Sequence, residues 1–142
     1  PNEITLKTTN VFDDFKKYVD SFAPDLLAIS CTEDMFELGI LLLKQVRKYK
    51  IPTILGGVFA TFAPDLALSY DEIDIICKGE GEDALRSLCR RMRTGKRYDD
   101  ISNLWIKNKD GSIKTNPTMM IDMDANPLID MSIFEEARFY KE

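Results

Sequence analysis

The chain contains no histidine among its 142 residues. This absence excludes the commonest general base, the Ser-His-Asp triad, and any metal or cofactor site that a histidine of this chain would ligate. Its three cysteines, Cys31, Cys77 and Cys89, form no CxxC pair and no metal-ligand spacing. That pattern argues against a zinc site or a disulfide framework. We therefore expect free, mostly buried thiols and no catalytic or metal-ligating side chain.

Long apolar runs and an excess of basic residues are also missing. No segment approaches the roughly 18 to 20 apolar residues that span a bilayer, and the N-terminus does not look like a signal peptide, which predicts a cytoplasmic location. The 19 Lys and Arg residues against 24 Asp and Glu residues give a net charge of −5. This balance argues against nucleic acid or an anionic membrane as a partner. Because the first residue is Pro1, we expect a piece of a longer protein.

What the chain does have is an alternation of short apolar runs and amphipathic segments, with 44% hydrophobic residues in all. Such a chain can bury one core. Strands are expected over 4–9, 25–30, 51–55 and 73–78, and helices over 11–22, 33–50, 64–69 and 83–93. The stripe expected to be buried on the second helix is Met35, Leu38, Leu42, Val46 and Tyr49. The alternation predicts an α/β fold with a doubly wound parallel sheet.

The pattern changes after Tyr98. Two extended runs, 104–107 and 112–115, flank the turn signal Asn108-Lys109-Asp110-Gly111, which predicts a small antiparallel hairpin. From Asn116 onward, apolar residues, aspartates and prolines follow without a period, as in an extended tail. We therefore expect an α/β domain over 1–101, a hairpin appendage over 102–116, and a linker over 117–142 toward a missing domain.

Three segments follow the carboxyl ends of neighbouring expected strands. In a doubly wound sheet, ligands bind at that edge, near the point where the strand order reverses. The candidate site residues are Ser30, Cys31, Thr32, Gly56, Gly57, Val58, Phe59, Gly79, Glu80, Gly81 and Glu82. Taken singly, each segment is explained by helix capping or a tight turn.

Together, the three segments fit a large, mostly neutral ligand whose tail slides between strands. A nucleotide pyrophosphate fits less well, because the chain has neither GxGxxG after the first strand nor GxxxxGK[ST], and Glu80 and Glu82 would repel phosphate.

Four groups of residues carry a resemblance. They are Pro24 to Ser30; Gly56 to Thr61 with Pro64; Asp74 to Glu82; and Asn103-Leu104-Trp105 with Asp110-Gly111 and Asn116-Pro117. In this order and spacing they resemble the cobalamin (B12)-binding domain, a flavodoxin-like, Rossmann-like fold that precedes the radical S-adenosylmethionine (SAM) domain of cobalamin-dependent radical enzymes. The resemblance runs from about Asn10 to Phe134.

The resemblance implies roles for the candidate residues. Ser30 and Thr32 would border the buried nucleotide tail of the corrinoid, and Gly56 and Gly57 would make room for it. Val58 and Phe59 would line the corrin or the tail, although many relatives have a histidine where Phe59 stands. The loop Gly79 to Glu82 would reach the rim of the cofactor. The DxHxxG motif is absent, which implies a base-off corrinoid.

The resemblance also implies what lies outside this chain. No CxxxCxxC motif is present, so a [4Fe-4S] cluster and SAM are expected only in a downstream radical SAM domain, of methyltransferase or cyclase type. This chain alone is expected to be a non-catalytic part of that enzyme.

The central first strand of the sheet is expected to lie upstream of Pro1, because Ile4 to Thr9 reads as the peripheral second strand. Loss of a central strand would leave unpaired edges. We therefore expect either a rearranged sheet, with 4–9 filling the gap, or pairing between chains as a homo-oligomer. An alternative of another class is a cofactor-free flavodoxin-like interaction or sensor domain. A phosphate-accepting receiver domain is disfavoured, because no acidic cluster follows the first strand.

Overall fold

Five strands form one mixed sheet in the computed structural model, which describes residues 8–120, 122, 124, 126–128 and 130–133. The strands are β1 (Leu27–Ser30), β2 (Thr53–Gly56), β3 (Ile75–Cys77), β4 (Leu104–Lys107) and β5 (Ile113–Thr115). Strands β1, β2 and β3 pair in parallel, whereas β4 is antiparallel to β3 and β5 is antiparallel to β4. The expected α/β class and the antiparallel hairpin are confirmed. The hairpin continues the same sheet.

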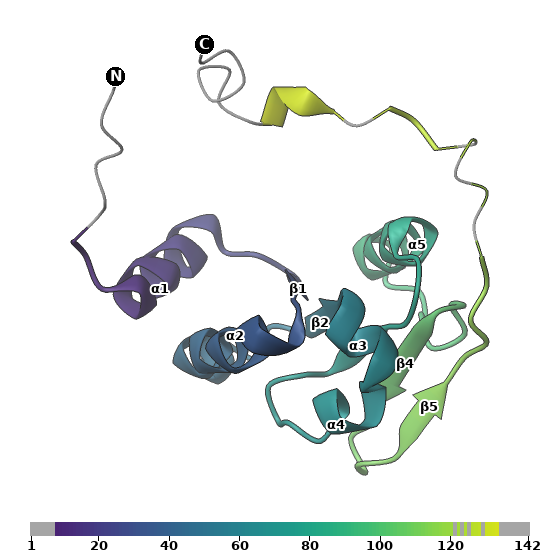
Figure 1. Cartoon of the computed structure of the whole chain (residues 1–142), viewed down its shortest axis with the longest axis horizontal. Coiled ribbons are helices and arrows are strands. Elements are labelled where there is room, and N and C mark those ends of the chain that lie inside the picture. Colours follow the sequence, from purple (N-terminus) through teal and green to yellow (C-terminus); the bar gives the residue numbers. More distant parts are fainter. Residues whose placement is uncertain (1–7, 121, 123, 125, 129, 134–142) are drawn as a thin grey trace.

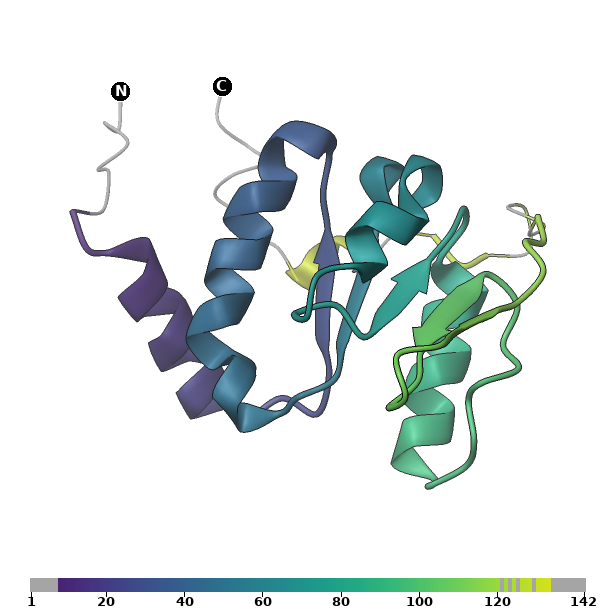
Figure 2. The ribbon, with the colours of Figure 1, turned by 90° about the horizontal axis from the view of Figure 1, so that it is seen from below.

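Helices cover both faces of the sheet (Figure 1). The helical segments of the described chain are α1 (Val11–Phe22), α2 (Glu33–Val46), η1 (Arg47–Tyr49), α3 (Val58–Phe62), α4 (Pro64–Leu68), α5 (Glu82–Arg93) and η3 (Met131–Ile133). Helices α2, α3 and α4 lie on one face, α5 lies on the other, and α1 lies alongside α2 (Figure 2). Within the described residues, no helix is long and apolar enough to cross a membrane.

The first two helices begin at the expected residues. The side chain of Asn10 caps α1 by accepting a hydrogen bond of 2.9 Å from the backbone N–H of Phe12. Thr32 occupies the N-cap position of α2, but its hydroxyl makes no capping hydrogen bond and donates instead to the carboxylate of Asp34. Thr32 therefore precedes α2 without capping it through its side chain.

The buried stripe of α2 differs from the expected one. Of the five residues predicted to be buried, only Val46 is, whereas Met35 is 49% exposed. The residues that α2 buries are Phe36, Ile40, Leu43 and Val46. The helix is rotated so that Phe36 reaches the Phe59 ring of α3, with the ring centroids 4.3 Å apart.

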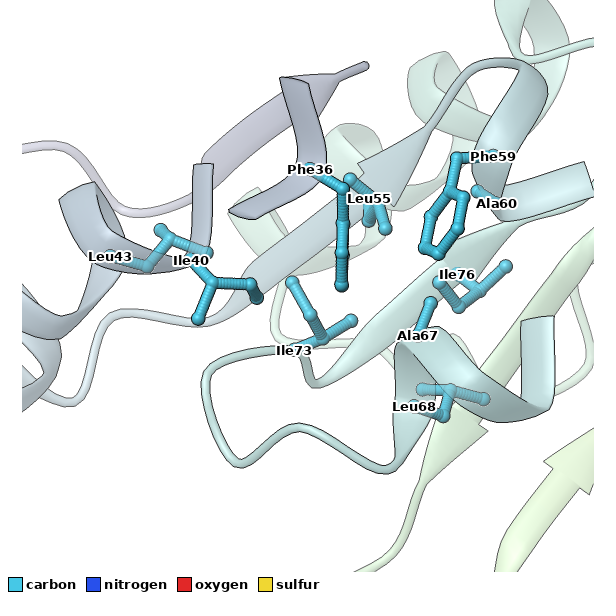
Figure 3. Close-up of a cluster of buried hydrophobic side chains, with 10 residues drawn as sticks. All are labelled: Phe36, Ile40, Leu43, Leu55, Phe59, Ala60, Ala67, Leu68, Ile73 and Ile76. Atoms are coloured by element: carbon cyan, nitrogen blue, oxygen red, sulfur yellow. The ribbon is translucent and has the colours of Figure 1, made fainter. Parts of the chain in front are cut away.

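Two apolar clusters lie on opposite faces of the sheet, because successive residues of a strand point to opposite sides. Leu55 and Ile76 belong to the cluster that packs against α2, α3 and α4 (Figure 3). Their neighbours Ile54 and Ile75 belong to the cluster that packs against α5. The sheet is thus buried on both faces around β2 and β3.

Strand β1 is one of the two edge strands of the described sheet, and β5 is the other. The strand order β1-β2-β3-β4-β5 follows the chain and contains no reversal among the described residues. Thr8 and Thr9 are described without strand structure, and residues 4–7 of the expected first strand lie outside the described residues. The expected rearranged sheet or pairing between chains therefore stays a prediction.

Two leucines of α4 test this packing. Leu68 is 1% exposed, whereas Leu66, on the same short helix, is 54% exposed. We expect Leu68→Ala to lower the free energy of unfolding by about 2 to 5 kcal/mol, because it leaves a cavity in the core. The matched variant Leu66→Ala should cost less than about 1 kcal/mol. Urea unfolding followed by circular dichroism measures both, and equal losses would contradict the described core.

Candidate functional site

A pocket of about 490 Å³ opens where β1, β2 and β3 end. The parallel register places Ser30 beside Gly56, and a Cβ atom added to Gly56 would lie 3.9 Å from Cβ of Cys77. These three positions therefore form one row across the carboxyl end of the sheet. The residues that line the pocket are Ala28, Ile29, Ser30, Ile54, Gly56, Gly57, Cys77, Gly79, Glu80, Gly81, Glu82 and Leu85.

The pocket exists because the side chains on this part of the α5 face are small. Ala28 and Ser30 of β1 share that face with Ile54 and Gly56 of β2, as the register and the strand alternation require. Helix α5 covers β3 and β4 on this face through buried residues such as Leu88. Ala28 and Ser30 are exposed, so the floor beside α5 is open at the β1 edge within the described residues.

The two adjacent glycines differ in what surrounds them. Gly57 has φ +88°, and a Cβ atom there would lie 2.8 Å from Oγ of Ser30 and 2.9 Å from the carbonyl oxygen of Cys31. The close approach of the β1 loop therefore requires glycine at position 57. A Cβ atom on Gly56 would meet nothing closer than 3.9 Å. The protein itself does not fill the space in front of Gly56.

Thr61 joins the second strand end to the third. Its hydroxyl donates a hydrogen bond of 3.1 Å to the carbonyl oxygen of Gly57 and accepts one of 3.1 Å from the backbone N–H of Gly79. The loop after β1 is linked to the loop after β2, because the N–H of Phe59 donates a hydrogen bond of 3.4 Å to the carbonyl oxygen of Cys31. The three strand ends are thus held together by hydrogen bonds that do not involve a ligand.

The loop from Gly79 to Glu82 forms the rim of the pocket and is held from behind. Gly79 adopts φ +80°. The side-chain amide of Asn103 donates a hydrogen bond of 2.8 Å to the carbonyl oxygen of Glu80. Sγ of Cys77 lies 3.7 Å from the same oxygen. The rim loop is therefore fixed through its backbone, while Glu80 and Glu82 are exposed.

The pocket is neutral at its floor and acidic at its rim. Burial is the main cause, and the carboxylates of Glu82 and Glu80 are lesser causes, of a rise in the pKa of the Cys77 thiol to about 11. Cys77 is thus a neutral thiol at physiological pH, which makes it neither a reactive nucleophile nor a thiolate ligand. No group of three or more His, Cys, Asp or Glu side chains in the described part of the chain is placed to hold a metal ion.

Seven of the eleven candidate residues line the pocket. They are Ser30, Gly56, Gly57, Gly79, Glu80, Gly81 and Glu82. The other four lie elsewhere. Cys31 is half-buried. The pKa of its thiol is raised, mainly by burial and to a lesser extent by the nearby Asp34 carboxylate. Thr32 starts α2, Val58 is 61% exposed at the start of α3, and Phe59 is buried against Phe36 in the opposite cluster (Figure 3).

Sequence reasoning missed the pocket floor and the residues that hold the loops. Ala28, Ile54, Cys77 and Leu85 line the pocket and were not candidates. A sequence signal for Ala28, Ile54 and Cys77 did exist. Each stands two residues before a candidate residue, and residues two apart on a strand point to the same face. Thr61 stands in the same glycine-containing stretch as Gly57. Its role in joining two loops had no sequence signal of its own.

A larger cleft, of about 840 Å³, lies at the opposite end of the sheet. Its lining includes Arg47 and Asp74, whose side chains form two hydrogen bonds of 3.1 and 3.0 Å. The same carboxylate accepts a hydrogen bond from the N–H of Thr53, at the start of β2. None of the candidate residues lines this cleft, and its ion pair stabilises the amino-terminal edge of the sheet.

Comparison with solved structures shows the same fold in two proteins. The chain superposes on the cobalamin-dependent SAM radical enzyme OxsB, with aqua-cobalamin and SAM bound, with a TM-score of 0.67 and 19% identity over 78% of this chain. It superposes on the radical SAM methyltransferase TsrM from Kitasatospora setae, with cobalamin and a [4Fe-4S] cluster bound, with a TM-score of 0.66 and 18% identity over 78% of this chain. It spans only 16% of the OxsB chain and 22% of the TsrM chain.

Comparison at the level of sequence agrees with the fold. No curated protein sequence matches the chain. The family model described as B12 binding domain matches residues 3–89, which include β1, β2, β3 and the loops that form the pocket. With a pocket bounded by small residues at the ends of these strands and a model that matches more than half of its length, the chain belongs to the B12-binding domain family.

Proposed function

We propose that the pocket at the ends of β1, β2 and β3 holds the nucleotide tail of a base-off cobalamin. The observation that carries the proposal is the unfilled space in front of Gly56, between Ser30 and Cys77. A volume of about 490 Å³ lies within the range of roughly 300 to 1,000 Å³ that is usual for small-molecule sites. It suits a nucleotide-sized group rather than the whole cofactor.

The corrin ring would lie outside this pocket, over the carboxyl end of the sheet. Two apolar side chains of α3, Val58 and Phe62, are 61% and 83% exposed at this end. Exposed apolar side chains beside a pocket offer surface that a ligand can remove from water. Val58 and Phe62 would thus contact the ring or its side groups, while the buried Phe59 would support them from the core.

The residues of this chain would hold the cofactor without reacting with it. Cobalamin, when bound, supplies a cobalt centre that can carry a methyl group. The chain has no histidine to ligate that metal, and Cys77 is a neutral thiol in the pocket. The Ser30 hydroxyl and the backbone groups of the rim loop are uncharged polar groups near the tail. Their role would be to orient the tail and to exclude water.

The parent protein would be a cytoplasmic cobalamin-dependent radical SAM enzyme of methyltransferase or cyclase type. This proposal is supported by the common fold with OxsB and TsrM, in which the matching region is a small part of the chain. The [4Fe-4S] cluster and SAM would belong to a domain downstream of residue 142. Either the strand expected over 4–9 would fill the gap beside β1, which has one neighbouring strand among the described residues, or two copies of this chain would pair there. The competing proposal is a cofactor-free interaction or sensor domain.

Titration with hydroxocobalamin separates the two proposals. We expect the purified chain to retain a stoichiometric amount of corrinoid after desalting, with the visible spectrum of a base-off form, because the pocket binds the displaced tail. Cys89 is exposed, and its thiol could capture the cobalt, so the titration should be repeated with Cys89→Ser. If this variant retains no corrinoid, the proposal of a cofactor-free domain is favoured.

Gly56 provides a test of the tail pocket. We expect Gly56→Val to fold, because a Cβ atom at this position has no contact closer than 3.9 Å and valine suits a strand. Its added methyl groups would occupy the tail site and weaken cobalamin binding by about tenfold or more. Equilibrium binding followed by visible absorbance measures the change.

Gly39→Ala is the matched control for that experiment. Gly39 lies in α2, where an added Cβ atom would be 3.8 Å from Ile29 on the opposite face of the sheet. We expect it to leave the affinity unchanged. If Gly56→Val also bound cobalamin like the unmodified chain, the tail would not lie at Gly56.

Alkylation of the cysteines maps the pocket independently. The thiolate is the reactive form, so Cys77, with a pKa of about 11, should react with iodoacetamide far more slowly than the exposed Cys89 near neutral pH. The rate at Cys77 should rise with pH toward pH 11. Cyanocobalamin should slow labelling at Cys77 and leave Cys89 unaffected, as measured by peptide mass spectrometry. Equal protection of both thiols would contradict binding in this pocket.

A further inference from the structure

Asn103, the residue before β4, stands out because its side chain is buried and fully hydrogen-bonded behind the rim loop. It is 3% exposed and adopts a left-handed conformation with φ +69°. Its amide nitrogen donates to the carbonyl oxygens of Glu80, over 2.8 Å, and of Met119, over 3.0 Å. Its amide oxygen accepts a hydrogen bond of 2.6 Å from the N–H of Met119. One side chain thus joins the rim of the pocket to the segment that follows β5.

The backbone of Asn103 adds one hydrogen bond to the segment that follows β5 and one to the residue before the rim loop. Its N–H donates to the carbonyl oxygen of Pro117 over 2.9 Å, and its carbonyl oxygen accepts from the N–H of Lys78 over 2.8 Å. We call residues 117–120 the strap. Glu80 precedes Asn103 by 23 residues, and Met119 follows it by 16, so the contacts are not local turns.

The strap also packs directly against the rim. A Cβ atom on Gly79 would lie 3.3 Å from Cγ2 of Thr118, which is tighter than ordinary van der Waals contact. On the other side, a groove of about 500 Å³ is lined by Glu80, Asn103, Met119 and Met120 among others. Glu80 therefore belongs both to the rim of the cofactor pocket and to this groove.

The conformation of the backbone at position 103 does not by itself require these bonds. Glycine adopts a positive φ more readily than asparagine does. The amide adds a donor and an acceptor that must be satisfied once they are buried, and here they are satisfied by rim and strap backbone groups. What asparagine provides at this position, and glycine would not, is therefore the side-chain link between the rim loop and the strap.

We infer that Asn103 is a positioning residue that couples the cofactor pocket to the strap, an inference that rests on the proposed function. Through Glu80 it fixes the rim loop in the position that closes over the tail. Through its hydrogen bonds to Met119, the same side chain fixes the strap against the rim loop. Because coupling between two sites is reciprocal, a corrinoid in the pocket should stabilise the strap, although residues 117–120 do not line the pocket.

Hydrogen exchange on the unmodified chain tests the coupling without any substitution. Cyanocobalamin should slow exchange of the Met119 amide, which donates to Asn103, as well as that of amides in the rim loop. Slowing confined to the rim would overturn the inference and leave the proposed function intact. If the unmodified chain binds no corrinoid, the proposed function fails and the inference fails with it.

The second arm uses Asn103→Gly, which keeps the backbone conformation and removes the amide. We expect cobalamin binding to weaken by about tenfold. In this variant, the slowing at Met119 on binding should be lost. Asn103→Asp keeps the acceptor for Met119 and loses both donors, so it should weaken binding and keep part of the effect at Met119.

The matched control is Asn116→Ala, just before the strap. It removes the hydrogen bond of 2.7 Å from the Asn116 amide to the carbonyl oxygen of Leu104 without touching the rim loop. We expect it to lower stability and leave the cobalamin affinity unchanged. If Asn103→Gly behaves in the same way, or if both variants lose affinity in proportion to their stability, Asn103 has a structural role only and the inference is overturned.

Discussion

The approach of the β1 loop to Gly57 is the constraint on which the site depends. With only 2.8 Å between the position of an added Cβ atom and Oγ of Ser30, the chain can bring these two strand ends together only with glycine at position 57. The approach sets the start of α3 and so directs Phe59 into the core against Phe36. It also places the carbonyl oxygen of Gly57 where the Thr61 hydroxyl can bind it and reach Gly79. The contact thus places the loops after β1 and β2 against each other, and Thr61 links them to the loop after β3.

The two faces of the sheet differ in how closely their side chains pack. On the face of α2, α3 and α4, large side chains such as Leu55 and Ile76 are buried, with exposed fractions of 1% and 0%. On the α5 face, the residues at the end of β1 and β2 are small, and packing stops short of Ser30 and Gly56. An open recess of this kind leaves its apolar lining in contact with water in the free protein. Its presence beside a well-packed face is consistent with a ligand that covers this lining.

The sequence predicted the parts of the structure that depend on local patterns. The helix expected over 11–22 is α1, the parallel strands follow apolar runs, and Asp110-Gly111 marked the hairpin turn. Rotation of α2 could not be predicted, because Phe36 and Met35 fit a helical stripe equally well until Phe59 is placed against one of them. The same limit applies to the site. Glycines and hydroxyls at strand ends were visible, but Ala28 and Cys77 became lining residues only through the strand register. Asn103 is separated in sequence by 23 residues from Glu80 and by 16 from Met119, so no local sequence pattern indicated that they are in contact.

The chemistry of the pocket limits what the chain can contribute. Without histidine, it has no imidazole for a metal and no general base of the usual kind. Burial and two nearby carboxylates keep the Cys77 thiol protonated, so the one soft ligand atom in the pocket is neutral. Glu80 and Glu82 stand at the exposed rim, where solvent screens their charge. The main contribution of the chain is therefore the shape of the site. A recess lies in front of Gly56, and the loop at its rim is held by hydrogen bonds from Thr61 and Asn103. A site built this way acts by fixing the position of a group that brings its own reactivity, and its precision depends on the residues that hold the loop rather than on those that touch the ligand.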